Sequence, residues 1–334
     1  MTRVQSAARL HFGFSNLSLS HSRLYGALGV ALEGPTLSLR ADPADAVDAP
    51  ASIRGLVETV CSLLGVDGAS ITVESALPSH VGLGSGTQRA LAVAAAVAGA
   101  HDRSVDVRRL APSLGRGGRS GIGVGTFERG GFLLDAGHPT ARFTTARPDD
   151  GEWTVPPVAA RHRIPDDWRF LLVVPAVDPG RSGDAEDASI RTVIEDAEPA
   201  LADRISGLIT RGVLPAIAAG SADRFGEAVA EIGRLNGAWY NDEQGGVYRP
   251  PVGELVAALD AEPGVYGAGQ SSWGPTVYGV TDAAHATAAR RAGRAALEAA
   301  GVAGDVRVVA GRNHGALRDG IPYGPTVAGA DGSA

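Results

Sequence analysis

The length, composition and charge of the 334-residue chain exclude several classes of protein. Hydrophobic residues make up 44% of it, the formal net charge is −7, and no run of basic residues stands out, so we expect a globular protein that does not bind nucleic acid. The length favours two domains. The chain has no lysine, and all 30 of its basic residues are arginine. An anionic ligand must therefore be held by arginine, backbone N–H groups, hydroxyls or a metal.

The single cysteine and the hydrophobic segments indicate the cellular compartment of the protein. Cys61 lies in an apolar pattern with helical spacing, so we expect it to pack in the core. The first 20 residues have no secretory signal, and no apolar stretch is long enough to cross a bilayer. We therefore expect a cytoplasmic protein without a membrane partner.

The first 140 residues predict strands, helices and a glycine-rich loop in mixed order. Alternating or short apolar runs predict strands at residues 4–10, 29–32, 36–40 and 70–74. Helical spacing predicts helices at residues 52–64, 86–98 and 107–114, the first with Ser52 as its N-cap and Gly65 as its stop. Residues 122–127 and 131–134 resemble a hairpin that ends at Asp135.

The rest of the chain predicts a second domain. Residues 140–167 are rich in Pro, Arg and Asp, and we place the boundary there, which gives domains at 1–160 and 161–334. Strands are predicted at 169–174, 265–266, 276–280 and 306–309, and helices at 185–210, 221–240, 252–259 and 283–299. The tail after Pro325 should fray. Because strands and helices mix without strict alternation, we expect a two-lobed α+β fold.

The strongest local signal is the first glycine loop, residues 78–88, with the sequence PSHVGLGSGTQ between a predicted strand and a predicted helix. The first N–H groups of a helix have no partner within the helix, and glycine lets the backbone close around an anion. Ser85 and Gln88 fit a capping box. The simpler alternative is a turn that only caps the helix. The loop is not a P-loop, because the GxxxxGK[ST] pattern is absent.

Two glycine loops resemble motifs of the GHMP superfamily, which includes galactokinase, homoserine kinase and mevalonate kinase. The first glycine loop is similar to the motif PxxxGLGSSA, and the second glycine loop, residues 267–275, is similar to the third motif of these proteins. The resemblance implies two α+β lobes with the anion loop between them. Gly86 stands where the kinases have a second serine, Gly123 stands where many have a catalytic aspartate, and lysine is absent. These departures argue against a kinase.

Six stretches instead resemble one branch, the beta-ribofuranosylaminobenzene 5'-phosphate synthase family. They are residues 8–14, 80–88, 115–120, 126–132, 244–248 and 269–275. This resemblance implies a decarboxylating phosphoribosyl transferase that joins phosphoribosyl diphosphate to 4-aminobenzoate, or to 4-hydroxybenzoate in some relatives, and releases diphosphate and carbon dioxide. It also implies a role in methanopterin-type cofactor synthesis, Mg²⁺ without a nucleotide cofactor, and a homodimer. A GHMP-type kinase and a non-catalytic phosphometabolite-binding protein remain the alternatives.

The candidate site residues follow from the loops and from this resemblance. We expect the phosphates of the donor to be bound by Gly82, Leu83, Gly84, Ser85, Gly86, Thr87, Gln88 and Arg116. Candidate catalytic residues are Arg9, His11, Arg119 and Glu128, and candidate magnesium ligands are Glu128 and Asp135. Around the second glycine loop we expect substrate contacts from Gln244, Gly269, Gln270, Ser271, Ser272 and Trp273.

Several of these residues also have structural interpretations. Arg116 and Arg119 suit a second phosphate or a benzoate carboxylate, or they are solvated surface residues. His11 is a catalytic candidate, although a lone histidine is usually structural. Phe12 and Phe14 suit a planar acceptor, but core packing is the expected use of Phe12.

Overall fold

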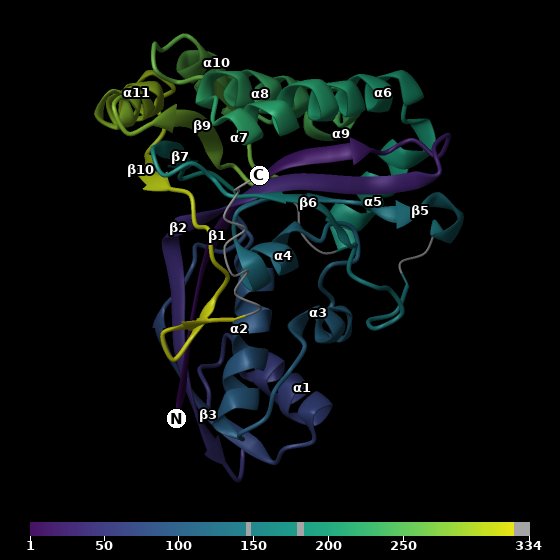
Figure 1. Cartoon of the computed structure of the whole chain (residues 1–334), viewed down its shortest axis with the longest axis vertical. Helices are drawn as coiled ribbons and strands as arrows, with labels where there is room; N and C mark the ends of the chain where they lie inside the picture. Colours follow the sequence, from purple (N-terminus) through teal and green to yellow (C-terminus); the bar gives the residue numbers. More distant parts are fainter. Residues whose placement is uncertain (145–147, 179–183, 324–334) are drawn as a thin grey trace, which may run out of the picture.

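A computed structural model describes residues 1–144, 148–178 and 184–323 of the chain, with the helices, strands and termini arranged as in Figure 1. Helices and antiparallel sheets are mixed, which confirms the α+β prediction. The tail after Pro325 lies outside the described residues. In the part of the chain that is described, no helix combines the length and the hydrophobicity needed to cross a lipid bilayer.

The first sheet is built on two long strands, β1 (Thr2–Asn16) and β2 (Arg23–Ala44). Its order is β12-β11-β1-β2-β4-β6, and β3 and β5 also pair with β2. The shorter strands are β3 (Gly68–Ser75), β4 (Phe132–Asp135), β5 (His138–Pro139), β6 (Val158–His162), β11 (Leu317–Arg318) and β12 (Ile321–Pro322). β6 crosses the predicted boundary at residue 160, and β11 and β12 return to this sheet from the other end of the chain.

Helices cover one face of this sheet, at the lower end of the view in Figure 1. They are α1 (Arg54–Leu64), α2 (Ser85–Ala100), α3 (Val107–Leu110), the 3₁₀ helix η1 (Ala111–Leu114) and α4 (Ile122–Arg129). α2 is almost entirely buried because alanine and valine occupy most of its surface. α1 ends at Gly65 in the left-handed conformation and buries Cys61, as predicted, but it begins after Ile53 without the expected Ser52 cap.

The second sheet has the order β10-β7-β9-β8. Its strands are β7 (Trp168–Pro175), β8 (Gly267–Gln270), β9 (Val277–Asp282) and β10 (Gly304–Ala310). Helices α8, α10 and α11 form a layer above it in Figure 1. The helices of this half are α5 (Asp184–Asp196), α6 (Pro199–Leu208), α7 (Leu214–Ala219), α8 (Ala222–Trp239), α9 (Asn241–Gln244), α10 (Val252–Asp260) and α11 (Ala286–Ala299). Two single turns complete the set, η2 (Thr140–Arg142) and η3 (Ile209–Val213).

One apolar core joins the two halves. Phe12 of β1 lies edge-on to Phe225 of α8 and to Tyr278 of β9, with ring centroids 5.8 and 5.0 Å apart. All three side chains are almost completely buried. Edge-to-face aromatic pairs of this kind add stability beyond the area that they bury. Phe12 therefore packs in the core, as predicted, and fixes β1 against the second half of the chain.

The predicted hairpin at 122–134 is wrong in its first half, where residues 122–129 form α4. Gly123 and Gly125 disfavour a helix by their propensity, but packing overrides it. A Cβ on Gly123 would lie 3.0 Å from Thr87 of α2, and one on Gly125 would lie 2.8 Å from Leu133 of β4. The two glycines thus allow α4 to approach α2 and β4 closely.

Three smaller predictions also differ from the structure. The predicted helix 185–210 is divided before Pro199, where proline opens α6. Residues 267–270 of the second glycine loop form β8, so only residues 271–275 make the turn. Ser85 and Gln88 do not form a capping box: Gly84 is the N-cap of α2 and no side chain caps the helix. The Gln88 amide instead donates to the carbonyl of Gly123, 2.9 Å away.

Candidate active site

A cavity of about 810 Å³ collects most of the predicted site residues. Its wall comes from β1, the first glycine loop, residues 114–120, α8 and the turn at 272–274, which are far apart in the sequence. The volume is in the range of small-molecule sites. The segments contribute different chemistry to different parts of the wall.

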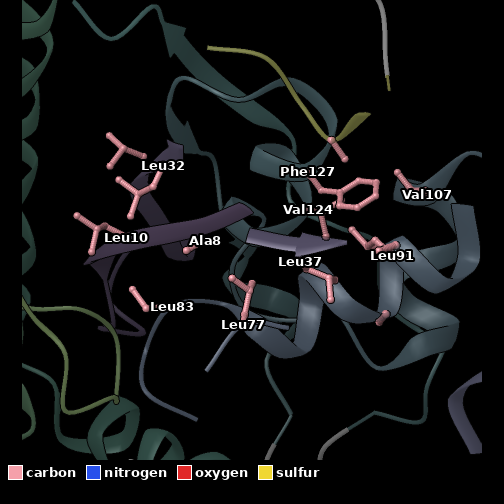
Figure 2. Packing of buried hydrophobic residues seen from close by; sticks show 14 of the residues in the cluster. Ala8, Leu10, Leu32, Leu37, Leu77, Leu83, Leu91, Val107, Val124 and Phe127 are labelled. Carbon is pink, nitrogen blue, oxygen red and sulfur yellow. The ribbon is translucent and has the colours of Figure 1, made fainter. Parts of the chain in front are cut away.

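The first glycine loop is anchored by Leu83, which points into the core beside Ala8 and Leu10 (Figure 2). On either side of it, Gly82 and Gly84 have φ values of +88° and +81°, which residues other than glycine rarely adopt. The Leu83 carbonyl accepts from the N–H of Arg9 at 3.1 Å. These contacts aim the N-terminus of α2 at the cavity, where a helix offers unpaired N–H groups to an anion.

Two arginines lie on the glycines of this loop. A Cβ on Gly84 would lie 3.0 Å from Cγ of Arg9, and a Cβ on Gly86 would lie 3.2 Å from Nη1 of Arg116. Arg9 also donates to the carbonyl of Gly82 at 2.6 Å. The glycines therefore provide the space for guanidinium groups that supply the positive charge of a lysine-free loop.

Arginine dominates the charge of the cavity wall. Among the described residues the lining arginines are Arg9, Arg89, Arg116, Arg119, Arg142 and Arg191, whereas the lining carboxylates are Asp150 and Glu152. A wall with this balance attracts anions. Guanidinium groups also match the geometry of phosphate and carboxylate oxygens.

His11 lies between the glycine loops and an aromatic part of the wall. Its backbone N–H donates to Oγ of Ser271 at 3.1 Å, and its Nε2 lies 3.2 Å from Oγ of Ser120. Burial lowers the pKa of His11 to about 3, and the charges of Arg9 and Arg119 add to this effect. The imidazole is therefore neutral at physiological pH.

Aromatic rings continue the wall beyond His11. The Phe14 ring is edge-on to His11 at 5.2 Å and tilted against Tyr25 at 5.8 Å. From the other half of the molecule, Tyr240 and Trp273 form an edge-on pair with centroids 4.6 Å apart. We call the part of the wall around Arg9, Arg116 and Arg119 the cationic end and the part around Phe14, Tyr25, Tyr240 and Trp273 the aromatic end, with His11 at the junction. Arg142 and Arg191 also line the cavity, next to residues that pack with the aromatic end.

The structure divides the predicted site residues into those that line the cavity and those that lie outside it. The lining set is Arg9, His11, Gly82, Gly84, Ser85, Gly86, Thr87, Arg116, Arg119, Gln244, Gln270, Ser272 and Trp273. Leu83, Gln88, Gly269 and Ser271 are not in this lining, which corrects their predicted role as direct contacts. Ser271 is fully buried and instead donates to the carbonyl of Gly82 at 2.8 Å, so it ties the two glycine loops together.

Glu128 and Asp135 also lie outside the lining, against the prediction of a magnesium site. Oε2 of Glu128 forms an ion pair with Arg108 at 2.7 Å. The carboxylate of Asp135 accepts from the N–H groups of Gly121 and Gly137 at 2.8 and 2.9 Å, which fixes the backbone before α4. In the described part of the chain, His, Cys, Asp and Glu form no group of three that suits a metal ion. Neither residue therefore fits a metal at the cavity, and both have structural roles.

Sequence reasoning missed part of α8. Gly233, Asn236 and Gly237 of α8 face the cavity, as does Tyr240, which follows the last residue of the helix, and the four have the spacing i, i+3, i+4, i+7. Small and polar residues on the buried face of a helix were the available signal. Asn236 accepts from the N–H of Phe14 at 2.7 Å and donates to its carbonyl at 3.0 Å, so it joins α8 to β1.

The fold and the two glycine loops define the class of this protein. Family models of the GHMP kinases match it twice, the N terminal domain at residues 51–131 and the C terminal model at residues 213–299. Phosphomevalonate kinase of Streptococcus pneumoniae has the same fold, with a TM-score of 0.65 at 14% identity over 92% of this chain and 98% of that one. Galactokinase of Lactococcus lactis, complexed with galactose, gives 0.65 at 13% identity over 94% of both chains. The chain is a GHMP-fold protein.

Curated relatives narrow this class to one family. The beta-ribofuranosylphenol 5'-phosphate synthase of Methanothermobacter thermautotrophicus is 33% identical over 94% of this chain and 97% of its own length. The protein of that name from Archaeoglobus fulgidus is 33% identical over 84% of this chain and 88% of its own length. The chain belongs to the beta-ribofuranosylphenol 5'-phosphate synthase family, a family of enzymes.

Proposed function

We propose that this protein transfers the phosphoribosyl group of phosphoribosyl diphosphate to a 4-substituted benzoate, with loss of diphosphate and carbon dioxide. 4-Hydroxybenzoate and 4-aminobenzoate are the candidate acceptors, and the name of the relatives, which refers to a phenol, favours the hydroxy acid. The product would serve methanopterin-type cofactor synthesis.

The observation that carries this proposal is the composition of the cavity. One end combines the N-terminus of α2 with the guanidinium groups of Arg9, Arg116 and Arg119, and the other end is aromatic. A donor with a diphosphate and a 5'-phosphate needs the first end, and a planar benzoate suits the second. The junction at His11 is where the two substrates would meet.

The reaction needs little acid–base chemistry from the protein. The bond between C1 of the ribose and the diphosphate oxygen breaks, and the oxygen keeps the electron pair. The ring carbon that bears the carboxylate bonds to C1, and the carbon–carboxylate bond then breaks and returns its electrons to the ring. Carbon dioxide leaves, and no proton has to be removed from the ring. Holding the reactants in contact and excluding water supply most of the acceleration.

Two features of the wall suit a cationic C1. The arginines and N–H groups around the first glycine loop stabilise charge on the departing diphosphate. A neutral His11 lies beside the junction without repelling the positive ribose, because its lowered pKa keeps the ring unprotonated. The aromatic rings on the other side of the wall exclude water from the electrophilic C1 of the ribose.

A kinase of the same fold fits these residues less well. The second serine of the kinase motif is replaced by Gly86, whose missing side chain leaves room for Arg116. The expected aspartate is replaced by Gly123, which packs against Thr87. A non-catalytic phosphometabolite-binding protein would need the cationic end only, and it gives no reason for the aromatic end.

The requirement for Mg²⁺ and the homodimer stay predictions. Mg²⁺ is commonly held by substrate phosphates with one or two protein carboxylates, and Asp150 and Glu152 are the described carboxylates on the cavity wall. Adding EDTA to the assay tests the metal, and sedimentation equilibrium tests the dimer.

One assay tests the function. The protein is incubated with Mg²⁺, phosphoribosyl diphosphate and carboxyl-labelled 4-hydroxybenzoate or 4-aminobenzoate, and labelled carbon dioxide and diphosphate are measured together. We expect equal amounts of the two products without any consumption of ATP. ATP-dependent phosphorylation of a small alcohol at a metabolic rate would support the kinase, and tight donor binding without turnover would support the binding protein.

A further inference from the structure

We propose that the hydroxyl of Tyr248 and the side-chain carbonyl of Gln270 bind the 4-substituent of the aromatic acceptor and select a hydroxyl there. This inference rests on the proposed function, which assigns an aromatic acceptor to the cavity. It adds the two groups that recognise the substituent and a physical reason for the preference.

Tyr248 presents a hydroxyl that the protein itself does not use. Its side chain lines the cavity, and the hydroxyl oxygen is buried beside Gly233 without a hydrogen-bond partner among the described residues, so a small rotation of the ring has to bring it to a ligand. A buried polar group without a partner costs free energy, so such groups in a ligand cavity often await a ligand. The nearby Tyr278 hydroxyl differs, because it is satisfied by the carbonyl of Val229 at 3.2 Å.

Gln270 offers the complementary group. Its Nε2 donates to the carbonyl of Ser272 at 3.1 Å, which fixes the orientation of the amide. The Oε1 atom is then left as an acceptor, and it too is buried without a partner in the described structure. Gln270 lies at the end of β8, directly before the turn that carries Trp273.

The lining residues around Tyr248 and Gln270 differ in charge from those of the first glycine loop, although the turn at 271–274 packs against Gly82 of that loop. The cavity-lining residues of the segments around Tyr248 and Gln270 are Gln244, Val247, Tyr248, Gln270, Ser272, Trp273 and Gly274, and none of them is charged. The lining arginines belong to other segments. A phosphate is better neutralised at the arginines, whereas an uncharged hydroxyl suits this region.

α8 connects the polar pair to the aromatic end. A Cβ on Gly233 would lie 3.7 Å from the Tyr248 hydroxyl, and Tyr240 lies seven residues further along the chain, directly after the end of α8. Seven residues correspond to about 10 Å of helix. A benzoate that places its 4-substituent at Tyr248 would therefore lie along this stretch, with its carboxylate end toward Tyr240 and Trp273.

The two groups match a phenolic hydroxyl better than an amine. A hydroxyl donates one hydrogen bond, here to Oε1 of Gln270, and accepts another, here from the hydroxyl of Tyr248. The nitrogen of an aminobenzoate donates twice, but its lone pair is delocalised into the ring and accepts poorly. The Tyr248 hydroxyl would then lose an acceptor, so the hydroxy acid should bind more tightly.

Tyr248→Phe tests the inference, with Tyr278→Phe as the matched control. Michaelis constants for 4-hydroxybenzoate, 4-aminobenzoate and phosphoribosyl diphosphate are measured together with the melting temperature. For Tyr248→Phe we expect the Michaelis constant for the hydroxy acid to rise about two- to tenfold, the range of one neutral hydrogen bond. The Michaelis constant for the donor should not rise and the melting temperature should not fall, because no hydrogen bond within the described protein is lost. Tyr278→Phe should lower the melting temperature and leave all three Michaelis constants unchanged.

Gly233→Ala provides a second variant that keeps the tyrosine. The added methyl would meet the Tyr248 and Tyr278 hydroxyls at 3.7 and 3.6 Å, which is ordinary contact, so the fold should tolerate it. It would occupy space beside the Tyr248 hydroxyl, and we expect a higher Michaelis constant for the acceptor without a lower melting temperature.

Four outcomes would overturn the inference. A rise in the Michaelis constant for the donor alone would assign the Tyr248 hydroxyl to the ribose, and an unchanged constant for the acceptor in both variants would remove it from the site. Equal losses for the hydroxy and amino compounds would refute the selection. If the wild-type protein releases no carbon dioxide, the proposed function fails, and the inference is then judged separately by calorimetric binding of 4-hydroxybenzoate to the wild type and to Tyr248→Phe, where equal affinities refute it.

Discussion

Gly86→Ser is the most direct test of the view that glycine makes room for arginine. Gly86 is the second residue of α2 and its φ is not positive, so a side chain causes no backbone strain. Its Cβ would lie 3.2 Å from Nη1 and 3.5 Å from Cζ of Arg116, which forces the guanidinium to shift. A charge-assisted hydrogen bond contributes about 1.5–3 kcal/mol. Losing one to the donor should therefore raise its dissociation constant roughly 10- to 150-fold.

Gly86→Ser should weaken donor binding but should leave the free energy of unfolding unchanged or raise it. Serine is better than glycine in a helix by about 0.5 kcal/mol. Gly55→Ser is the matched control, because Gly55 is the second residue of α1 and no atom lies within 4 Å of its added Cβ. Calorimetric titration with phosphoribosyl diphosphate and urea unfolding measure the two effects.

The outcome that refutes this reasoning is specific. If Gly86→Ser binds the donor as tightly as Gly55→Ser and the wild type, Arg116 does not hold a phosphate from its present position. The substitution also restores the second serine of the kinase motif. We expect no ATP-dependent phosphorylation, because Gly123 and the absence of lysine remain, and a gain of that activity would favour the kinase.

Four further predictions follow from single residues. Gly84→Ala should destabilise the fold by about 1–2 kcal/mol, because its φ of +81° is left-handed, and an unchanged urea midpoint would contradict this. Arg119→Ala should weaken binding of one anionic substrate by about 1.5–3 kcal/mol, and Arg119→Lys should restore it only partly; wild-type Michaelis constants for both substrates would exclude the residue from the site. Burial raises the pKa of Asp135 to about 6, above its ordinary 3.8, so its contribution to the free energy of unfolding should be largest below pH 3.8 and fall by about 3 kcal/mol as the pH rises to 6. Asp135→Asn should remove that fall. The pKa of His11, lowered to about 3 from 6.5, acts in the opposite direction, so the free energy of unfolding should rise between pH 3 and 6.5, and His11→Gln should abolish this rise. Urea unfolding across this pH range compares both variants with the wild type, and a slope unchanged by either substitution would refute the assigned burial effect.

The sequence by itself determined the features that depend on neighbouring residues. The left-handed Gly65 that ends α1, the burial of Cys61 and the glycine loop before α2 follow from local spacing and backbone conformation. Such features are readable because a helix or a turn repeats its contacts every few residues. The resemblance of six short stretches added the family, which the two halves of the fold and the curated relatives bear out.

The tertiary structure alone decided which of these residues meet. The hydrogen bond from His11 to Ser271 joins residues 260 apart, and the bond from Phe14 to Asn236 joins residues 222 apart. No local pattern encodes either contact. They depend on the core around Phe12, which holds β1 against α8.

Long-range packing also explains the predictions that failed. The sequence predicts the first half of a hairpin at residues 122–127, but Gly123 and Gly125 allow the close approach of α4 to its neighbours. Glu128 and Asp135 read as metal ligands, although Arg108 and two backbone N–H groups already occupy their oxygens. The residue type defines which partners a side chain can bind, but only the folded chain determines which of these partners lies within contact distance.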